Sequence, residues 1–212
     1  MILKDLIKFL LGEMNNELKH LELENNNNIN DNSFPFNADQ TNKFQILNDF
    51  KKLMKKQNKS IISKIFCILI ENEIKCQNCS RVKYGYQVAY FLEFPLEEIY
   101  EFCNKNNINT NFQTENMEYK KIIPIDACFQ YYSESIILSG ENQIYCTFCH
   151  KKTDSAFLNR IYSLSPIIII IFDRGEGKAF DCDVDFPQIL NLEKFTQNKT
   201  NYNYKLKGNK QS

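Results

Sequence analysis

Four of the eight cysteines are arranged as two Cys-x-x-Cys motifs. The first is Cys76-Gln-Asn-Cys79 and the second is Cys146-Thr-Phe-Cys149. Two residues between paired cysteines allow a tight turn that points both sulfurs at one ion, and tetrahedral Zn²⁺ held by four thiolates is the common closed structural site. We therefore interpret Cys76, Cys79, Cys146 and Cys149 as the ligands of one structural Zn²⁺, with no open position for catalysis.

The spacing of the two motifs says what such an ion would join. The 66 residues between Cys79 and Cys146 exceed the roughly 15 to 20 residues of a compact zinc ribbon, so the ion would tie distant hairpins together. Two alternatives remain open, namely unmetallated thiols that are simply packed or exposed, and a redox site. A redox motif sits at a helix N-terminus, where the dipole lowers the thiol pKa. The residues after Cys79 resemble a strand and those after Cys149 are His-Lys-Lys, so the redox interpretation lacks its helix.

The other cysteines and the two histidines have structural explanations. His150, beside Cys149, is a candidate alternative ligand or base, although a neighbour of a zinc turn is more often solvated. His20 is expected near the end of a helix. The remaining cysteines lie in apolar contexts or, in one case, between carboxylates that raise a thiol pKa: Cys67, Cys103, Cys128 and Cys182. No catalytic Cys–His pair is predicted.

Hydrophobic periodicity predicts the elements that position these groups. Apolar residues at steps of three and four predict an amphipathic helix over residues 3–21, and a helix or part of an insertion over 44–59. The Asn-rich stretch between them is a predicted loop. Residues 61–75 and 82–94 are predicted strands that form a long hairpin with the first Cys-x-x-Cys at its tip.

The second half continues with shorter elements. Residues 119–125 are predicted to be extended, 126–132 to form a short helix, and the Ile-rich run 167–172 to form a strand buried on both faces. Residues 196–212 are predicted to be a polar, frayed tail. The predicted fold class is α+β, with an N-terminal helix, mostly antiparallel strands and zinc-knuckle fingers.

Composition limits the classes of function. The 212 residues suit one domain, and 43% hydrophobic with 25% charged residues exclude a wholly disordered or collagen-like chain. A formal net charge of zero argues against a nucleic-acid partner. Apolar runs of six residues cannot cross a bilayer, which takes about 20 in a helix, so we expect no membrane partner. With no signal peptide recognised, we expect an intracellular protein, cytoplasmic or nuclear, in which cysteines do not form a disulfide framework.

The order of the pieces resembles the ubiquitin-specific protease family of cysteine deubiquitinases. The first half carries a helix with an aspartate and a Phe-Leu-Leu core, an Asn-Glu-Leu end, a Phe, the first zinc knuckle and the strand after it. These correspond to residues 4–11, 16–18, Phe66, 76–79 and 91–94.

The second half of the resemblance begins with a short helix. An approach similar to "Glu-x-Leu-x-Gly-x-Asn", the second knuckle, a Leu-Ser-Pro strand, an Arg turn and a Phe-Pro segment follow it. These features lie at 125–132, 134–142, 145–149, 164–174 and 184–192. The resemblance implies a partial papain-like deubiquitinase domain over residues 1–195, with fingers at about 61–94 and 117–161 and palm strands at 166–192.

The departures from the family pattern bear on catalysis. The family's nucleophilic Cys lies in an Asn-x-x-Cys-type segment before the first helix, and its general base lies in a Gly-His-Tyr-type segment after a strand similar to Tyr204-Lys205-Leu206. Neither segment is found in residues 1–212, so no catalytic residue is assigned and this chain alone is expected to be inactive, because thiol chemistry needs a thiolate with a base in reach. Thiol-dependent removal of ubiquitin from proteins is the expected activity of a full-length enzyme.

Two other functions stay open at this point. The first is a catalytically dead ubiquitin-binding or scaffolding zinc module, whose partners are ubiquitin or ubiquitinated proteins; a truncated gene model fits the sequence equally. The second is a zinc-ribbon nucleic-acid protein. Six basic residues around the knuckles would serve it, but such charge is more often a solvated face: Lys75, Arg81, Lys83, Lys151, Lys152 and Arg160.

Overall fold

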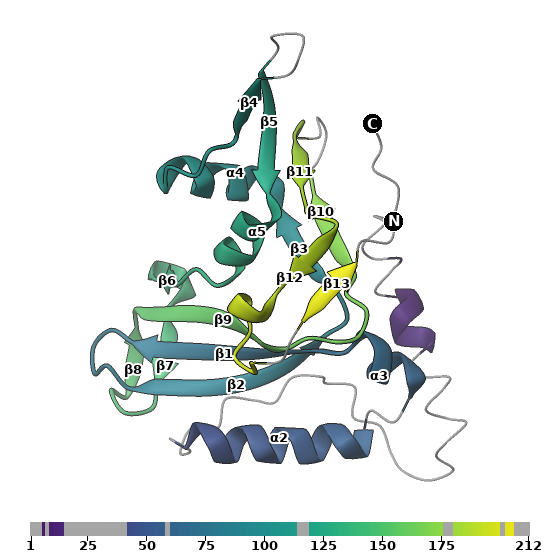
Figure 1. The fold of residues 1–212 in the computed structure, drawn as a ribbon. Coiled ribbons are helices and arrows are strands. Elements are labelled where there is room, and N and C mark those ends of the chain that lie inside the picture. Colours follow the sequence, from purple (N-terminus) through teal and green to yellow (C-terminus); the bar gives the residue numbers. More distant parts are fainter. Residues whose placement is uncertain are drawn as a thin grey trace. The chain divides into compact units, whose positions relative to one another are not determined.

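A computed structural model describes residues 6, 9–14, 42–57, 60–113, 119–175, 180–199 and 202–205. The chain divides into two compact units, each assembled from separate segments. Unit 1 consists of Met1–Phe91 and Glu134–Ile169, and unit 2 of Leu92–Ser133 and Ile170–Ser212. The elements of both are labelled in Figure 1. Within the described residues, no helix has the length and apolar character that a membrane span requires.

Unit 1 is built on an antiparallel four-stranded sheet with the order β2-β1-β9-β6. Its strands are β1 (Ile68–Cys76), β2 (Val82–Ala89), β9 (Ser155–Ser163) and the short edge strand β6 (Ile136–Leu138). After β6 come a 3₁₀ turn, η1 (Gly140–Asn142), and a small hairpin of β7 (Ile144–Cys146) and β8 (Lys151–Thr153). The predicted hairpin with the first cysteine motif at its tip is confirmed as β1 and β2. Its second strand, predicted over 82–94, ends at Ala89, and Leu92–Pro95 forms a separate strand.

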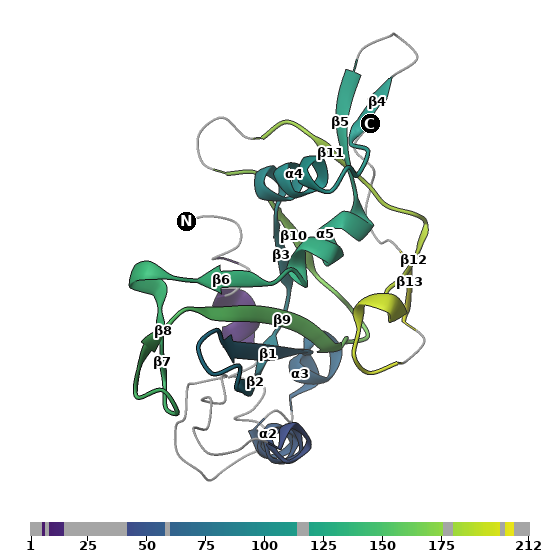
Figure 2. The same ribbon diagram turned by 90° about the vertical axis from the view of Figure 1, so that its left-hand side faces the viewer.

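Helix α2 (Lys43–Gln57) lies along one face of this sheet (Figures 1 and 2). Its apolar residues recur at helical spacing, and Ile46, Leu47 and Phe50 are buried against Leu69 of β1 and Tyr86 of β2. The Phe50 and Tyr86 rings lie 5.9 Å apart between centroids. The helix predicted over 44–59 is therefore confirmed. Of the helix predicted over 3–21, Leu6 and residues 9–14 are helical, and the rest lies outside the described residues.

The prediction of strand over the whole of 61–75 is wrong at its start. Ile61–Phe66 forms a short helix, α3, and β1 begins only at Ile68. Buried Ser60 caps α3: its Oγ accepts a hydrogen bond from the Ser63 N–H at 3.2 Å. The cap and the burial of Ile62 and Ser63 outweigh the strand preference of the β-branched isoleucines.

We predict that Ser60→Ala lowers the free energy of unfolding by about 1 kcal/mol, because it leaves an N–H at the start of α3 without its acceptor. Urea denaturation followed by circular dichroism measures the change. Ser139→Ala is the matched control, since Ser139 stands at the N-cap of η1 and its side chain makes no cap hydrogen bond. Equal losses in the two variants would contradict the capping role.

Unit 2 combines two helices with short strands. Strand β3 (Leu92–Pro95) runs into α4 (Leu96–Lys105), and β4 (Asn111–Gln113) and β5 (Tyr119–Pro124) run into α5 (Ile125–Tyr132). The later elements are β10 (Ile170–Asp173), β11 (Asp183–Asp185), β12 (Ile189–Asn191), η2 (Glu193–Phe195) and β13 (Asn203–Lys205). Strand β10 pairs with β3 and β11 with β5, both in parallel, whereas β12 and β13 are antiparallel.

An aromatic cluster forms the core of unit 2. Phe94 and Phe129 are fully buried, with ring centroids 5.2 Å apart, and Phe172 packs on Phe94 at 6.3 Å. Phe195 of η2 stacks on Phe129 at 5.2 Å. Each such pair adds about 0.5–1.5 kcal/mol to the effect of burial, so β3, α5 and β10 are held by a common set of rings.

Unit 2 confirms the helix predicted at 126–132 and corrects two other predictions. The strand expected over 167–172 spans only Ile170–Asp173 and is half-buried rather than buried on both faces, and Ile167 is half exposed. Within the segment predicted as a frayed tail, the described residues 196–199 and 202–205 include buried Thr196 and strand β13, so the predicted fraying is wrong for these residues. The mostly antiparallel α+β fold is confirmed.

Candidate metal centre

Both cysteine motifs are turns that start at the last residue of a strand. Cys76 ends β1 and Cys146 ends β7, and the second cysteine of each motif lies in the following turn. Because β9 pairs with β1 and follows directly on β8, the sheet carries the second turn to the tip of the first hairpin. The predicted joining of distant hairpins therefore has a structural basis in this register.

The two turns share one backbone conformation. The residue after each second cysteine has a positive φ, +57° at Ser80 and +52° at His150. In the first turn, the Ser80 N–H donates to the Cys76 carbonyl at 2.9 Å and the Cys76 N–H donates to the Arg81 carbonyl at 2.9 Å. These bonds close the loop and turn both sulfurs to one side.

The four sulfurs converge. Cys76 Sγ lies 3.8 Å from Cys149 Sγ, Cys79 Sγ lies 3.7 Å from Cys146 Sγ, and all four lie within 4.8 Å of one another. Four sulfurs at about 2.3 Å from a tetrahedral Zn²⁺ are separated by about 3.8 Å. Each close contact joins one motif to the other, so the donor set fits a single tetrahedral ion.

Neighbouring groups hold the sulfurs in place. Thr153 Oγ1 lies 3.2 Å from Cys76 Sγ, and the Asn78 side-chain amide donates to Cys149 Sγ at 3.2 Å. The Arg81 guanidinium stacks on the Phe148 ring, 3.6 Å from its centroid, and so connects the two turns directly. These supports could not be predicted from the sequence. The arginine and the phenylalanine were visible beside the motifs, but their pairing depends on the fold.

The environment favours thiolates at two of the four positions. Burial raises the pKa of Cys76, but hydrogen bonds from the Thr153 hydroxyl and the N–H groups of Cys79 and Asn78 outweigh it and lower the pKa to about 6. At Cys146, burial is likewise outweighed by N–H groups of Cys149 and Phe148, which lower its pKa. Backbone N–H groups directed at sulfur are the support that a metal-bound thiolate requires.

The other candidate residues are not brought to this cluster. His150 is exposed and lies outside the group of sulfurs, and His20 lies outside the described residues. Burial raises the pKa of each remaining thiol. At Cys182 burial contributes more to the raised pKa than the carboxylates beside it. The four residues concerned are Cys67, Cys103, Cys128 and Cys182.

Two of the six basic residues around the knuckles have partners inside the protein. Arg81 stacks on Phe148, and the Arg160 guanidinium pairs with Glu73 and lies 3.7 Å from Glu71. Their charge is used within the fold, which weakens the case for a phosphate-binding face.

Comparison with known proteins identifies the family. The family model described as ubiquitin carboxyl-terminal hydrolase matches residues 3–210. The chain belongs to the ubiquitin carboxyl-terminal hydrolase family. The resemblance to ubiquitin-specific proteases drawn from the order of motifs is confirmed. No curated protein matches the chain.

A solved structure supports the fold. A chain in the structure of the SAGA Ubp8/Sgf11/Sus1/Sgf73 DUB module superposes with a TM-score of 0.59 at 15% sequence identity. The match covers 95% of this chain and 37% of that chain. This ubiquitin carboxyl-terminal hydrolase family member thus spans little more than a third of the solved chain's length.

Proposed function

We propose that this chain is the ubiquitin-holding part of a cysteine-type deubiquitinase, comprising the fingers and part of the palm. The proposed domain covers residues 1–195, with fingers at about 61–94 and 117–161, palm strands at 166–192 and a polar segment at 196–212. Membership of the family supports this assignment. The observation that carries it is the convergence of four sulfurs from two turns that lie 66 residues apart, because this cluster joins the tips of the two hairpins.

The metal in this proposal is a structural Zn²⁺ bound by Cys76, Cys79, Cys146 and Cys149. Support comes from the sulfur separations of 3.7 and 3.8 Å and from a donor set made only of thiolates, which suits zinc. Four protein ligands leave no position for water or substrate. The ion would therefore stabilise the fold and take no part in hydrolysis.

We assign no catalytic residue within residues 1–212. In the described parts of the chain, no cysteine outside the cluster has a histidine partner, and burial raises the pKa of each such thiol. A thiol with a raised pKa and no base is a poor nucleophile. We propose that the full enzyme hydrolyses the bond after the C-terminus of ubiquitin by thiol acyl transfer, with nucleophile and base outside these residues.

We predict that the purified chain binds monoubiquitin saturably and releases no fluorophore from a C-terminal ubiquitin conjugate. Titration with labelled ubiquitin measures binding, and fluorescence over hours measures hydrolysis, with an active deubiquitinase as the positive control. Fluorophore release that persists after repurification would refute the absence of a catalytic set. Absence of binding by folded, zinc-loaded chain would refute the ubiquitin-holding role.

A catalytically dead ubiquitin-binding or scaffolding module is the second candidate. The same observation favours it, namely that no Cys–His pair occurs among the described residues. Sequencing the full transcript at both ends separates the two proposals. A reading frame with an Asn-x-x-Cys segment upstream and a Gly-His segment downstream supports the enzyme, and a frame of residues 1–212 alone supports the binding module.

We propose an intracellular location, cytoplasmic or nuclear, with ubiquitin or ubiquitinated proteins as partners and neither nucleic acid nor membrane. None of the eight cysteines forms a disulfide, which suits a reducing compartment. The balanced charge, 26 basic and 26 acidic residues, offers no surplus to attract phosphate.

A further inference from the structure

A cavity of about 520 Å³ lies between the second half of α2 and the strands beneath it. Its floor follows from strand register: Leu69 of β1 pairs with Val88 of β2 on one side and with Ser163 of β9 on the other. Val88 and Ser163 have small side chains, so this row fills less space under α2 than the larger residues at the other end of the helix. Phe50, Met54 and Cys67 complete the apolar lining.

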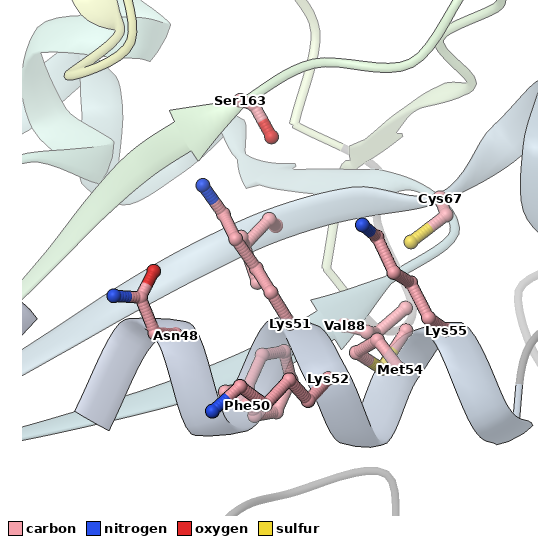
Figure 3. A pocket seen from close by; sticks show the side chains of 10 residues that line it. Asn48, Phe50, Lys51, Lys52, Met54, Lys55, Cys67, Val88 and Ser163 are labelled. Atoms are coloured by element: carbon pink, nitrogen blue, oxygen red, sulfur yellow. The ribbon is translucent and has the colours of Figure 1, made fainter. Parts of the chain in front are cut away.

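Lysines form the rim of this cavity. Lys51 and Lys55 rise from α2 toward the strands, with Cys67 and Ser163 on the opposite side (Figure 3), and Lys52 also lines it. The ten lining residues include three lysines and neither aspartate nor glutamate. Lys52 pairs with exposed Asp49 at 3.4 Å. Among the described residues, no carboxylate pairs with Lys51, which donates to the Tyr162 hydroxyl at 3.2 Å, or with Lys55.

We propose that this cavity is a docking site for an acidic peptide segment that inserts one apolar side chain. A volume of this size lies within the range of ligand sites, about 300–1,000 Å³, and exceeds what one side chain needs. Lys51 and Lys55 are one helical turn apart and lie on the same side of α2, where the Cβ atoms of such a pair are about 6 Å apart. Two carboxylates flanking a Leu or Phe would meet both ammonium groups while the apolar side chain contacts Leu69, Val88 and Met54.

A nucleic acid fits the same cavity less well. Binding of single strands depends on exposed aromatic faces on which bases stack. Phe50 is the aromatic residue in the lining, and it is 2% exposed because it packs on Tyr86. The charge therefore selects an acidic partner, and the aliphatic floor selects an apolar side chain rather than a base.

The test measures binding of the full chain, zinc-loaded, to a short fluorescein-labelled peptide in which Asp and Glu surround a central Phe. We expect saturable anisotropy that weakens about fivefold for Lys55→Glu, because charge reversal turns attraction into repulsion. Lys105→Glu in α4 is the matched control and leaves binding unchanged. Lys55 and Lys105 are both exposed, so the two variants retain the parent's unfolding curve.

Two further probes decide the chemistry of the partner. A peptide with Ala in place of the central Phe should bind much more weakly, and binding should fall as salt is raised. Equal binding of the Ala peptide would overturn the insertion of an apolar side chain. Equal effects of Lys55→Glu and Lys105→Glu, or tighter binding of an oligonucleotide or an anionic lipid vesicle through the same lysines, would overturn the peptide assignment. The ubiquitin assays do not enter this test, so its failure would leave the proposed function untouched.

Discussion

Replacing Cys76 with serine should remove the metal from the chain and unfold the tip that the two cysteine turns form. A serine hydroxyl is a poor zinc ligand at neutral pH, and the three remaining thiolates would lose the tetrahedral geometry that their 3.7–3.8 Å contacts prepare. Because a structural zinc site is not formed in the unfolded chain, its binding free energy, about 10–16 kcal/mol in zinc-finger peptides, contributes directly to folding. We therefore expect a loss of several kcal/mol.

Two measurements test this expectation: the zinc content of each variant and its unfolding temperature. The parent should carry about one zinc per chain, and Cys76→Ser should carry almost none and unfold at a lower temperature. Cys67→Ser is the matched control, since Cys67 is a half-buried thiol of the same unit that lies outside the sulfur cluster. A strong chelator added to the parent should reproduce the variant's unfolding curve. Folded parent without metal, or equal zinc in both serine variants, would refute the site.

The cluster of four cysteines was predictable because its signal is local. A Cys-x-x-Cys turn needs only four consecutive residues, and the two turns reveal themselves independently of the fold. The groups that support the sulfurs give no such local signal. Thr153 and the Arg81–Phe148 stack each connect one cysteine turn to the hairpin of the other. Their roles depend on the pairing of β1 with β9, which no short-range pattern in the sequence specifies.

Helix–strand ambiguity explains the errors in the isoleucine-rich segments. Residues 61–66 and 68–70 are both rich in isoleucine, and the Ser60 cap together with the burial of Ile62 and Ser63 favours helix in the first of them. Helix α4 was missed, although Glu97 and Glu98 in its first turn and Leu96, Ile99 and Cys103 at steps of three and four are a recognisable pattern. Strand β10 is shorter than predicted for a different reason. Its length depends on its neighbour β3, in which four residues pair with it.

Glu71 could not have been singled out from the sequence, yet among the described residues of unit 1 it is a fully buried acidic residue. It lies on β1 and accepts a hydrogen bond from the Tyr86 hydroxyl at 2.9 Å. It also forms an ion pair with Lys43 of α2 at 2.8 Å. Burial and the charge of Glu71 raise the pKa of Tyr86, so that its hydroxyl stays protonated and donates. The carboxylate thus joins α2 to both strands of the long hairpin.

Glu71→Ala should lower the free energy of unfolding by about 3–5 kcal/mol, because it leaves the buried Tyr86 hydroxyl without an acceptor and Lys43 without its partner. Glu71→Gln keeps an acceptor for Tyr86 and should cost less, about 1–3 kcal/mol. Glu73→Ala is the control, since Glu73 points to the same face two residues later but pairs with Arg160 at a partly exposed site, where an ion pair contributes about 1 kcal/mol or less. Urea denaturation of zinc-loaded protein ranks the three variants.

The order of the three losses in free energy of unfolding separates two explanations of how α2 is held to the sheet. If Glu71→Ala costs no more than Glu73→Ala, the attachment of α2 depends on the apolar contacts of Ile46, Leu47 and Phe50 alone, and the buried carboxylate is dispensable. If Glu71→Ala is worst and Glu71→Gln intermediate, both the charge and the acceptor contribute. The second result would mean that the hairpin is fixed at two points, by the metal at its tip and by the Glu71 network near the middle of the β1–β2 pairing, and metal removal alone should then leave α2 attached to the sheet.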